Sequence, residues 1–227
     1  MKKLSTLFLA LFFVSGVTFA QSNDASISQV GDDNEASFTQ SGDNNTGYIE
    51  QVGNNNVANI EANGSSHQSV IEQEGDNHNV QFSMFGIENT VEIRQYGTSD
   101  HMVGGNGNGV STVSQLGNYN EFYAEQNGNQ NGNTITSLFG GGDIQVGDHN
   151  LMDIFQDGSG NFAELFQIGT DNTALLKSIG NNNTASIFQE GAGHSADVSQ
   201  YGNSNTANIY QSGGQGQVII PGGSGAQ

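Results

Sequence analysis

Apolar and polar residues alternate along most of this chain in short segments that recur every eleven residues. Residues 25–35 read ASISQVGDDNE, and residues 36–46 follow at once with ASFTQSGDNNT. The shared template is A-x-[IVLF]-x-Q-x-G-x-x-N-x. Alternation with a period of two predicts a β-strand, and the Gly-x-x-Asn segment predicts a turn because Gly and Asn tolerate positive φ. A Gly at a fixed position in nearly every copy disfavours a helix.

Two copies make a strand–turn–strand–turn unit of 22 residues, which predicts one coil of an all-β β-solenoid. We count about eighteen half-repeats in residues 25–220, hence about nine coils with two facing parallel sheets. One coil cannot bury its apolar face alone, so neighbouring coils must stack. At roughly 4.8 Å per layer the rod would be about 40 Å long. Two stretches, 102–110 (MVGGNGNGV) and 138–144 (LFGGGDI), depart from the template and shift its phase.

The first twenty residues differ from the repeats. Lys2 and Lys3 precede an apolar run at 4–17, and Thr18-Phe19-Ala20 places small residues at the -3 and -1 positions of a cleavage site. This pattern predicts a secretory signal peptide at 1–20, with no transmembrane segment left after its removal. A short mature N-terminal segment (21–24) and a flexible tail (221–227) would flank the repeats.

The repeated Gln and Asn residues are the candidate functional residues. Unpaired buried amides cost about 1–3 kcal/mol each, but stacked coils place an identical amide above and below, as in cross-β ladders. The Gln ladder would contain Gln29, Gln40, Gln51, Gln73, Gln95, Gln115, Gln126, Gln145, Gln156, Gln167, Gln189, Gln200 and Gln211. The Asn ladder would contain Asn34, Asn45, Asn56, Asn89, Asn120, Asn150, Asn161, Asn172, Asn183 and Asn205. The turn glycines would be Gly31, Gly42, Gly53, Gly75, Gly97, Gly117, Gly147, Gly169, Gly180 and Gly202.

Counting alternate half-repeats divides the glutamines into two columns. Gln115 falls in the column of Gln29, and Gln126 in the column of Gln40, which Ala62 and Met84 interrupt. Outward aromatic residues would also align. Phe166, Phe188 and Tyr210 fall on one face, with Phe155 and Tyr201 opposite, and would serve either cross-strand stacking or lateral bundling and adhesion.

Composition narrows the function. The 227 residues carry a formal net charge of -19 with only four Lys or Arg, which excludes a nucleic-acid-binding protein because such proteins need clustered basic residues. Hydrophobic residues make up only 33% of the chain, below the roughly 45–50% of globular domains. There is no Cys, so no disulfide framework exists.

Other chemistry finds little support in the sequence. Gly-Asp turns such as Gly31-Asp32 and Gly75-Asp76 could offer oxygen ligands to calcium, but Asp is not kept at one turn position and the GGxGxDxUx repeat is absent. Three of the five histidines, His67, His78 and His194, simply occupy Asn positions. Residues 104–109 (GGNGNG) lack the Lys-Ser/Thr of a phosphate loop. We expect no enzyme, no metal site and no cofactor.

The ends of the solenoid carry the functional expectation. The first repeat begins about four residues after the signal peptide, without the polar cap that soluble solenoids use. Open strand edges should therefore pair head to tail with another copy of the chain, which gives an open filament.

These repeats resemble the curlin repeat of the curli amyloid family, whose signature is Q-x-G-x-x-N-x-A-x-x-x-Q. The signature occurs strictly at 29–40 (QVGDDNEASFTQ) and 200–211 (QYGNSNTANIYQ), and at 189–200 with His194 in place of Asn. The resemblance covers essentially the whole mature chain. This chain differs from the family in having about nine repeats instead of five or so, and in almost lacking the family's N-terminal secretion segment.

The resemblance implies a secreted, extracellular fibre of a bacterial biofilm matrix, built from this chain as its own main partner. It further implies export through an outer-membrane secretion channel and templating by a nucleator subunit. The chain could be the major subunit or the minor nucleator. The alternatives from another class are a soluble calcium- or ligand-binding β-solenoid and, with less support, an ice-binding one, for which no regular Thr array is present.

Overall fold

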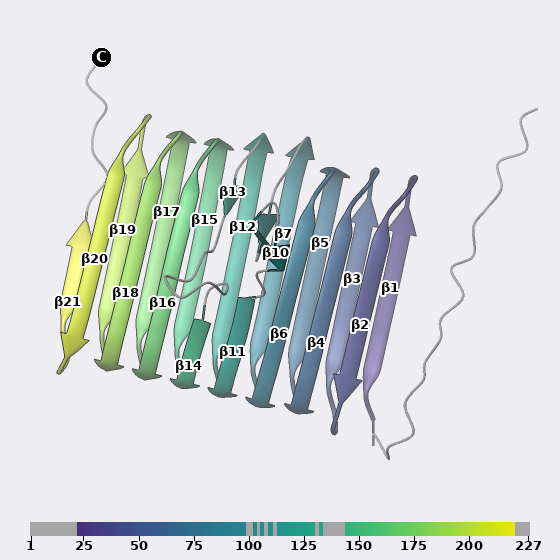
Figure 1. Ribbon diagram of the computed structural model, residues 1–227, viewed down its shortest axis with the longest axis horizontal. Coiled ribbons are helices and arrows are strands. Elements are labelled where there is room, and N and C mark those ends of the chain that lie inside the picture. Colours follow the sequence, from purple (N-terminus) through teal and green to yellow (C-terminus); the bar gives the residue numbers. More distant parts are fainter. Residues whose placement is uncertain are drawn as a thin grey trace, which may run out of the picture.

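The computed structural model describes residues 22–98, 113–129 and 144–220, together with short strands at 102–103, 105–106, 109–110 and 132–133. The expected signal peptide, the tail at 221–227 and most of the irregular stretch 138–144 lie outside the described residues. All regular elements of the described part are β-strands. They lie side by side across the long axis of the molecule (Figure 1).

The strands form two parallel sheets, which we name sheet A and sheet B. Sheet A contains, in spatial order, β1 (Asp24–Val30), β3 (Thr46–Val52), β5 (Gln68–Asp76), β7 (Thr90–Thr98), β12 (Glu121–Asn129), β15 (Leu151–Ser159), β17 (Thr173–Asn181), β19 (Ser195–Tyr201) and β21 (Gln217–Ile220). Sheet B contains β2 (Glu35–Ser41), β4 (Val57–Ser65), β6 (Asn79–Ile87), β8 (Met102–Val103), β11 (Val113–Asn118), β13 (Gly132–Asn133), β14 (Ile144–Asp148), β16 (Phe162–Thr170), β18 (Thr184–Ala192) and β20 (Thr206–Gly213). A separate antiparallel pair joins β9 (Gly105–Asn106) and β10 (Gly109–Val110).

The strands stack in register, so that each residue lies next to its counterpart one coil away. Ile27 pairs with Ile49, and Ile49 pairs with Ile71, each 22 residues further along the chain. Because successive strands of the chain alternate between the sheets, every neighbour within a sheet runs parallel. The all-β class and the two parallel sheets of a β-solenoid are therefore confirmed.

The expected nine coils are a slight overcount. Sheet A has nine strands, but the last, β21, has only four residues and no described strand of sheet B follows it. The stretch 102–110 and the copy that begins at Asn133 were each counted as a half-repeat, but β8 and β13 share the strand positions of β11 and β14 in sheet B.

In one layer of sheet B, a single strand position is shared by two strands, β8 and β11, that are separated in sequence. The residue offset between β6 and the next layer is 23 at Met102, which pairs with Asn79, but 31 at Val113, which pairs with Phe82. Eight additional residues therefore separate β8 from β11 in one layer. The layer above repeats the arrangement, since β13 pairs with β8 and β14 pairs with β11. The register resumes unchanged after each insertion.

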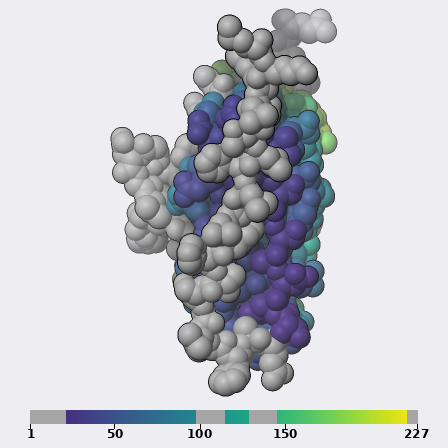
Figure 2. Space-filling view, turned by 90° about the vertical axis from the view of Figure 1, so that its right-hand side faces the viewer, coloured from purple at the N-terminus to yellow at the C-terminus, as the bar shows by residue number. Residues whose placement is uncertain are grey.

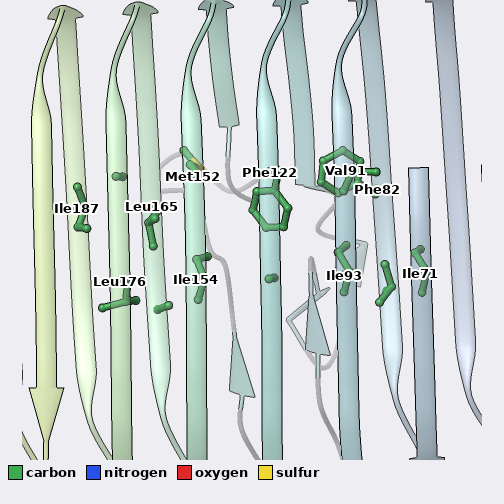
Figure 3. Packing of buried hydrophobic residues seen from close by; sticks show 14 of the residues in the cluster. Ile71, Phe82, Val91, Ile93, Phe122, Met152, Ile154, Leu165, Leu176 and Ile187 are labelled. Carbon is green, nitrogen blue, oxygen red and sulfur yellow. The ribbon is translucent and has the colours of Figure 1, made fainter. Parts of the chain in front are cut away.

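The core lies between the two sheets, where inward side chains of successive layers pack against one another. Figure 3 shows this packing for Ile71, Ile93, Ile154 and other members of the cluster. Within the core the aromatic rings of Phe82 and Phe122 are in contact, with their centroids 5.4 Å apart. Burial of these apolar side chains contributes about 1.5–3 kcal/mol for each large residue.

The turns are shaped by how closely the layers approach. Gly31 has φ of +118°, and a Cβ on it would lie only 1.9 Å from the carbonyl oxygen of Gly53 in the next layer. Glycine is thus required both by its backbone angle and by the neighbouring turn. Two residues later the backbone is left-handed again, as at Asp33 (φ 57°) and Glu88 (φ 55°).

Glu88 is a poor residue for this second turn position, which supplies our first prediction. A left-handed conformation costs an ordinary residue about 1–2 kcal/mol, whereas Asn adopts it more readily. We expect Glu88→Asn to raise the free energy of unfolding by about 1 kcal/mol relative to Glu88→Gln. Both variants remove the same charge, so denaturant unfolding of the pair isolates the backbone effect. Equal midpoints for the two would contradict it.

Candidate functional site

Several of the inward glutamines form hydrogen bonds in two directions. Gln51 donates from Nε2 to Gln73 Oε1 in the next layer of sheet A at 2.8 Å, and to the Glu35 carbonyl oxygen of sheet B at 3.0 Å. Gln73 does the same with Gln95 Oε1 at 2.9 Å and the Val57 carbonyl at 3.1 Å. One carboxamide therefore joins two layers along the axis and the two sheets across the core.

The structure places the thirteen predicted glutamines in two columns. The sheet A column contains Gln29, Gln51, Gln73, Gln95, Gln126, Gln156 and Gln200. The sheet B column contains Gln40, Gln115, Gln145, Gln167, Gln189 and Gln211.

The expected columns of Gln115 and Gln126 are wrong and must be exchanged. Gln126 accepts from Gln95 Nε2 at 2.9 Å in sheet A, and Gln115 donates to Gln145 Oε1 at 2.8 Å in sheet B. The error arises because residues 102–110 imitate a half-repeat in sequence. Counting them as a layer moves the following strands into the opposite sheet.

Both columns contain interruptions, and polar atoms beside them lack partners among the described residues. In sheet B the column passes Ala62 and Met84, so the buried Gln115 Oε1 receives no donor from the layer below. In sheet A the place above Gln156 is taken by Ser178. The serine side chain is too short to reach, and both side-chain polar atoms of Gln156 are left without a hydrogen bond.

The asparagines act differently from the expected amide ladder. Asn34 Nδ2 donates to the Gly53 carbonyl at 2.8 Å, and its Oδ1 accepts from the Asn56 backbone N–H at 3.0 Å. They therefore clamp the turn backbones of adjacent layers, which satisfies groups that would otherwise be buried without partners. Direct side-chain bonds also occur in part of the stack, as between Asn183 Nδ2 and Asn161 Oδ1 at 3.1 Å.

The ten predicted asparagines occupy two corners. The corner before sheet A holds Asn45, Asn89, Asn120, Asn150 and Asn172, with His67 and His194 in the same stack. The corner before sheet B holds Asn34, Asn56, Asn161, Asn183 and Asn205, with His78 in the same stack.

Asn23 was not singled out, although its Oδ1 accepts from the Asn45 N–H at 2.9 Å. The sequence could have indicated Asn23 as a member of the corner stack, because it lies 22 residues, one repeat unit, before Asn45.

The predicted turn glycines all adopt positive φ, and the structure adds others. Gly31, Gly42, Gly53, Gly75, Gly97, Gly117, Gly147, Gly169, Gly180 and Gly202 have φ between 98° and 124° or, for Gly75, 133°. Gly64, Gly86, Gly128, Gly158, Gly191 and Gly213 share this conformation. The Gln-x-Gly spacing identifies most of the added positions, but Gly64 and Gly86 follow Ala62 and Met84 and lack that mark.

The three histidines at Asn positions are built into the corners. His67 Nδ1 accepts from the Asn89 backbone N–H at 3.2 Å, which leaves Nε2, 3.2 Å from the Asn63 carbonyl oxygen, as the donor. Burial lowers the pKa of His67 below its ordinary value of 6.5, although its backbone hydrogen bonds act in the opposite direction. The neutral ring is therefore the form that fits the corner.

The outward faces of the two sheets differ in chemistry. On sheet A, Arg94 binds Glu72 at 3.0 Å and also Glu92, within a row of acidic side chains. Burial and the nearby Glu125 carboxylate raise the pKa of Asp153 in the same region.

Sheet B carries a stack of aromatic side chains. The rings of Phe166, Phe188 and Tyr210 are stacked with 5.0 Å between successive centroids. The expected cross-strand stacking is therefore present. Of the two residues expected on the opposite face, Phe155 lies on sheet A with Lys177 Nζ 5.5 Å from its ring centroid, and Tyr201 is exposed at the end of β19.

Within the described ranges, no group of three or more His, Cys, Asp or Glu residues is arranged to hold a metal ion. The same part of the chain contains no helix that is long and apolar enough to cross a membrane.

Comparison with known proteins identifies the repeat. The family model of the curlin associated repeat matches residues 20–53, 31–62, 42–75, 147–180 and 180–213. These matches cover more than half of the chain, which therefore belongs to the curlin-repeat family. Curlin repeats are typical of structural amyloid subunits and not of enzymes. No curated protein matched the chain.

The interruption at Ser178 gives the second prediction. We expect Ser178→Gln to continue the sheet A column between Gln156 and Gln200 and to raise the free energy of unfolding by about 1–3 kcal/mol. Ser199→Gln makes the same change on the outward face of the next strand and should have little effect. Denaturant unfolding of both variants tests this, and a destabilised Ser178→Gln would show that the column has no room for the longer side chain.

The corner histidine gives the third prediction. Because the folded-state pKa of His67 lies below 6.5, its contribution to stability is complete above that pH and declines as the pH falls toward the folded-state value. His67→Asn restores the repeat residue and should lose less stability between pH 8 and pH 5 than the parent chain. The change in denaturant midpoint measures this, and parallel losses in both proteins would refute the assignment.

Proposed function

We propose that this chain is the major structural subunit of a secreted amyloid fibre, which grows by head-to-tail stacking of solenoids. The observation that carries the proposal is the open state of the end layers. In β1 every residue is at least partly exposed, whereas the equivalent Ile49 and Gln51 of β3 are fully buried. Figure 2 shows this end, with the first strands in purple.

Open end layers favour polymerisation for a physical reason. An uncovered strand edge presents unpaired N–H and C=O groups to any strand of matching pattern. Here the matching pattern is the chain's own, because all layers share one register. The two ends are different surfaces, so their contact is heterologous and does not close into a ring. Repetition of it produces a filament with the strands perpendicular to its axis.

The remaining partners are proposed by analogy with the curlin-repeat family. We propose that the chain is exported to the cell surface through an outer-membrane channel and that a minor nucleator subunit templates its assembly. The role of major subunit is supported by the Gln columns, which reach Gln29 and Gln40 at one end and Gln200 and Gln211 at the other. The fibre would belong to a biofilm matrix and act in adhesion.

The test is assembly of the purified chain from Gln21 onward. We expect dye-binding filaments with a reflection near 4.7–4.8 Å along the fibre axis. Ile27→Lys, inward in the first layer, should raise the soluble concentration in equilibrium with fibres at least tenfold, equivalent to about 1.4 kcal/mol. Ser28→Lys, on the outward face of the same strand, should change it little. A chain that stays monomeric under all conditions would contradict the proposal.

A further inference from the structure

The strand β21 covers only half of the edge beneath it. Gln217 to Ile220 pair with Ser195 to Val198 of β19, and the second half of β19, from Ser199 to Tyr201, has no described neighbour on that side. In sheet B, β20 pairs with β18 on one side and has no described strand on the other side. Among the described residues, the end that carries β21 is therefore half-filled in sheet A and uncovered in sheet B.

The half-filled layer is incompatible with continuous stacking. Sheet A has nine strands with β21 included, whereas sheet B has eight stacked positions: β2, β4, β6, β11, β14, β16, β18 and β20. A second copy seated on β21 would face a missing layer, about 4.8 Å deep, above β20. If β21 leaves, both sheets end level, and β1 and β2 of the second copy can contact β19 and β20 together.

The sequence of β21 imitates the strand that would replace it. Val218 and Ile220 lie over Ala196 and Val198, the two inward apolar positions of β19. In β1 the same inward positions are held by Ala25 and Ile27, which pair with the next layer in the same register. β1 has seven residues against the four of β21, so it would cover the complete edge of β19.

A buried histidine at this end lacks the partner that its counterpart has. His194 is only 2% exposed, and its Nδ1 has no hydrogen-bond partner among the described residues. In the interior of the same corner stack, His67 Nδ1 accepts from the backbone N–H of Asn89. In this structure Gly216 lies beside His194 Nδ1, at the stack position that Asn89 holds beside His67. Asn23 of a second copy holds the equivalent stack position and would bring its N–H to His194.

The Gln columns end in the same unfinished way. Gln200 Nε2 donates to the Thr184 carbonyl at 2.9 Å, and no described Gln lies above it. Gln211 Nε2 donates to the carbonyl of Gly216, which leads into β21, at 2.8 Å. At the opposite end, Gln29 uses its Nε2 toward Gln51 and leaves Oε1 facing away from the stack. A second copy would extend both columns.

We propose that β21 is a placeholder strand that occupies the docking site for β1 of a second copy and is displaced when that copy adds. The inference rests on the proposed fibre function and names the contact by which the fibre grows. The competing strands share one register and one apolar pattern, so the exchange substitutes seven paired residues for four. β21 thereby shields the growing end until another copy arrives.

Weakening β21 tests the placeholder. Val218→Ser with Ile220→Ser removes its inward apolar contacts, while Ile219→Ser alters its outward side chain, which is 59% exposed. If the docking site is open in about one chain in ten, releasing β21 accelerates seeded elongation by up to about tenfold. We expect such acceleration for the double variant and a parental rate for Ile219→Ser. An unchanged or slower double variant would overturn the proposal.

Hydrogen exchange of the parent chain separates this proposal from the fibre function itself. In the folded monomer the amides of 217–220 should be partly protected, and in fibres they should exchange rapidly while those of β1 and of 199–201 become protected. Fibres that form with 217–220 still protected would overturn the placeholder and leave the fibre function standing. A failure to form any fibre would overturn both.

Discussion

The carboxamide of the inward glutamine, which donates one hydrogen along the axis and one across the core, is the interaction on which this solenoid depends. A chain with one-third hydrophobic residues cannot close a core of ordinary apolar density. Interior layers instead carry buried amide side chains, such as Gln51, that form hydrogen bonds to the neighbouring layer and across the core. Stability is thus a property of the stack, since a single coil would bury unpaired donors and acceptors.

Much of this arrangement could be predicted from the sequence. The period of eleven gave the strands, the alternation gave the inward set, and the recurrence of the same residue types gave the parallel in-register stacking. These features are local or strictly periodic, and each copy reports them again. The pairing of Phe166 with Phe188 was equally visible, because 22 residues separate them and both point outward.

The errors came from features that periodicity does not record. Residues 102–110 resemble a half-repeat, but backbone pairing divides them between β8, β9 and β10, so the layers after them change sheet. The asparagines share the spacing of a ladder, yet residue type does not reveal whether a backbone or a side-chain group is the partner. The second left-handed turn position was not assigned, because Asn or Asp holds it in only part of the turns and residues such as Ser66, Glu88 and Tyr119 hold it in others.

The two kinds of amide column have a directional consequence. Along the chain the Gln-to-Gln bonds donate toward the later layer, whereas in the Asn corners the backbone N–H of the later residue donates to Oδ1 of the earlier Asn. A copy added upside down would set Gln oxygen against Gln oxygen and corner donor against corner donor. Each unpaired group would cost about 1–3 kcal/mol. In the proposed filament all copies would therefore point the same way, and the two tips would be chemically distinct throughout growth.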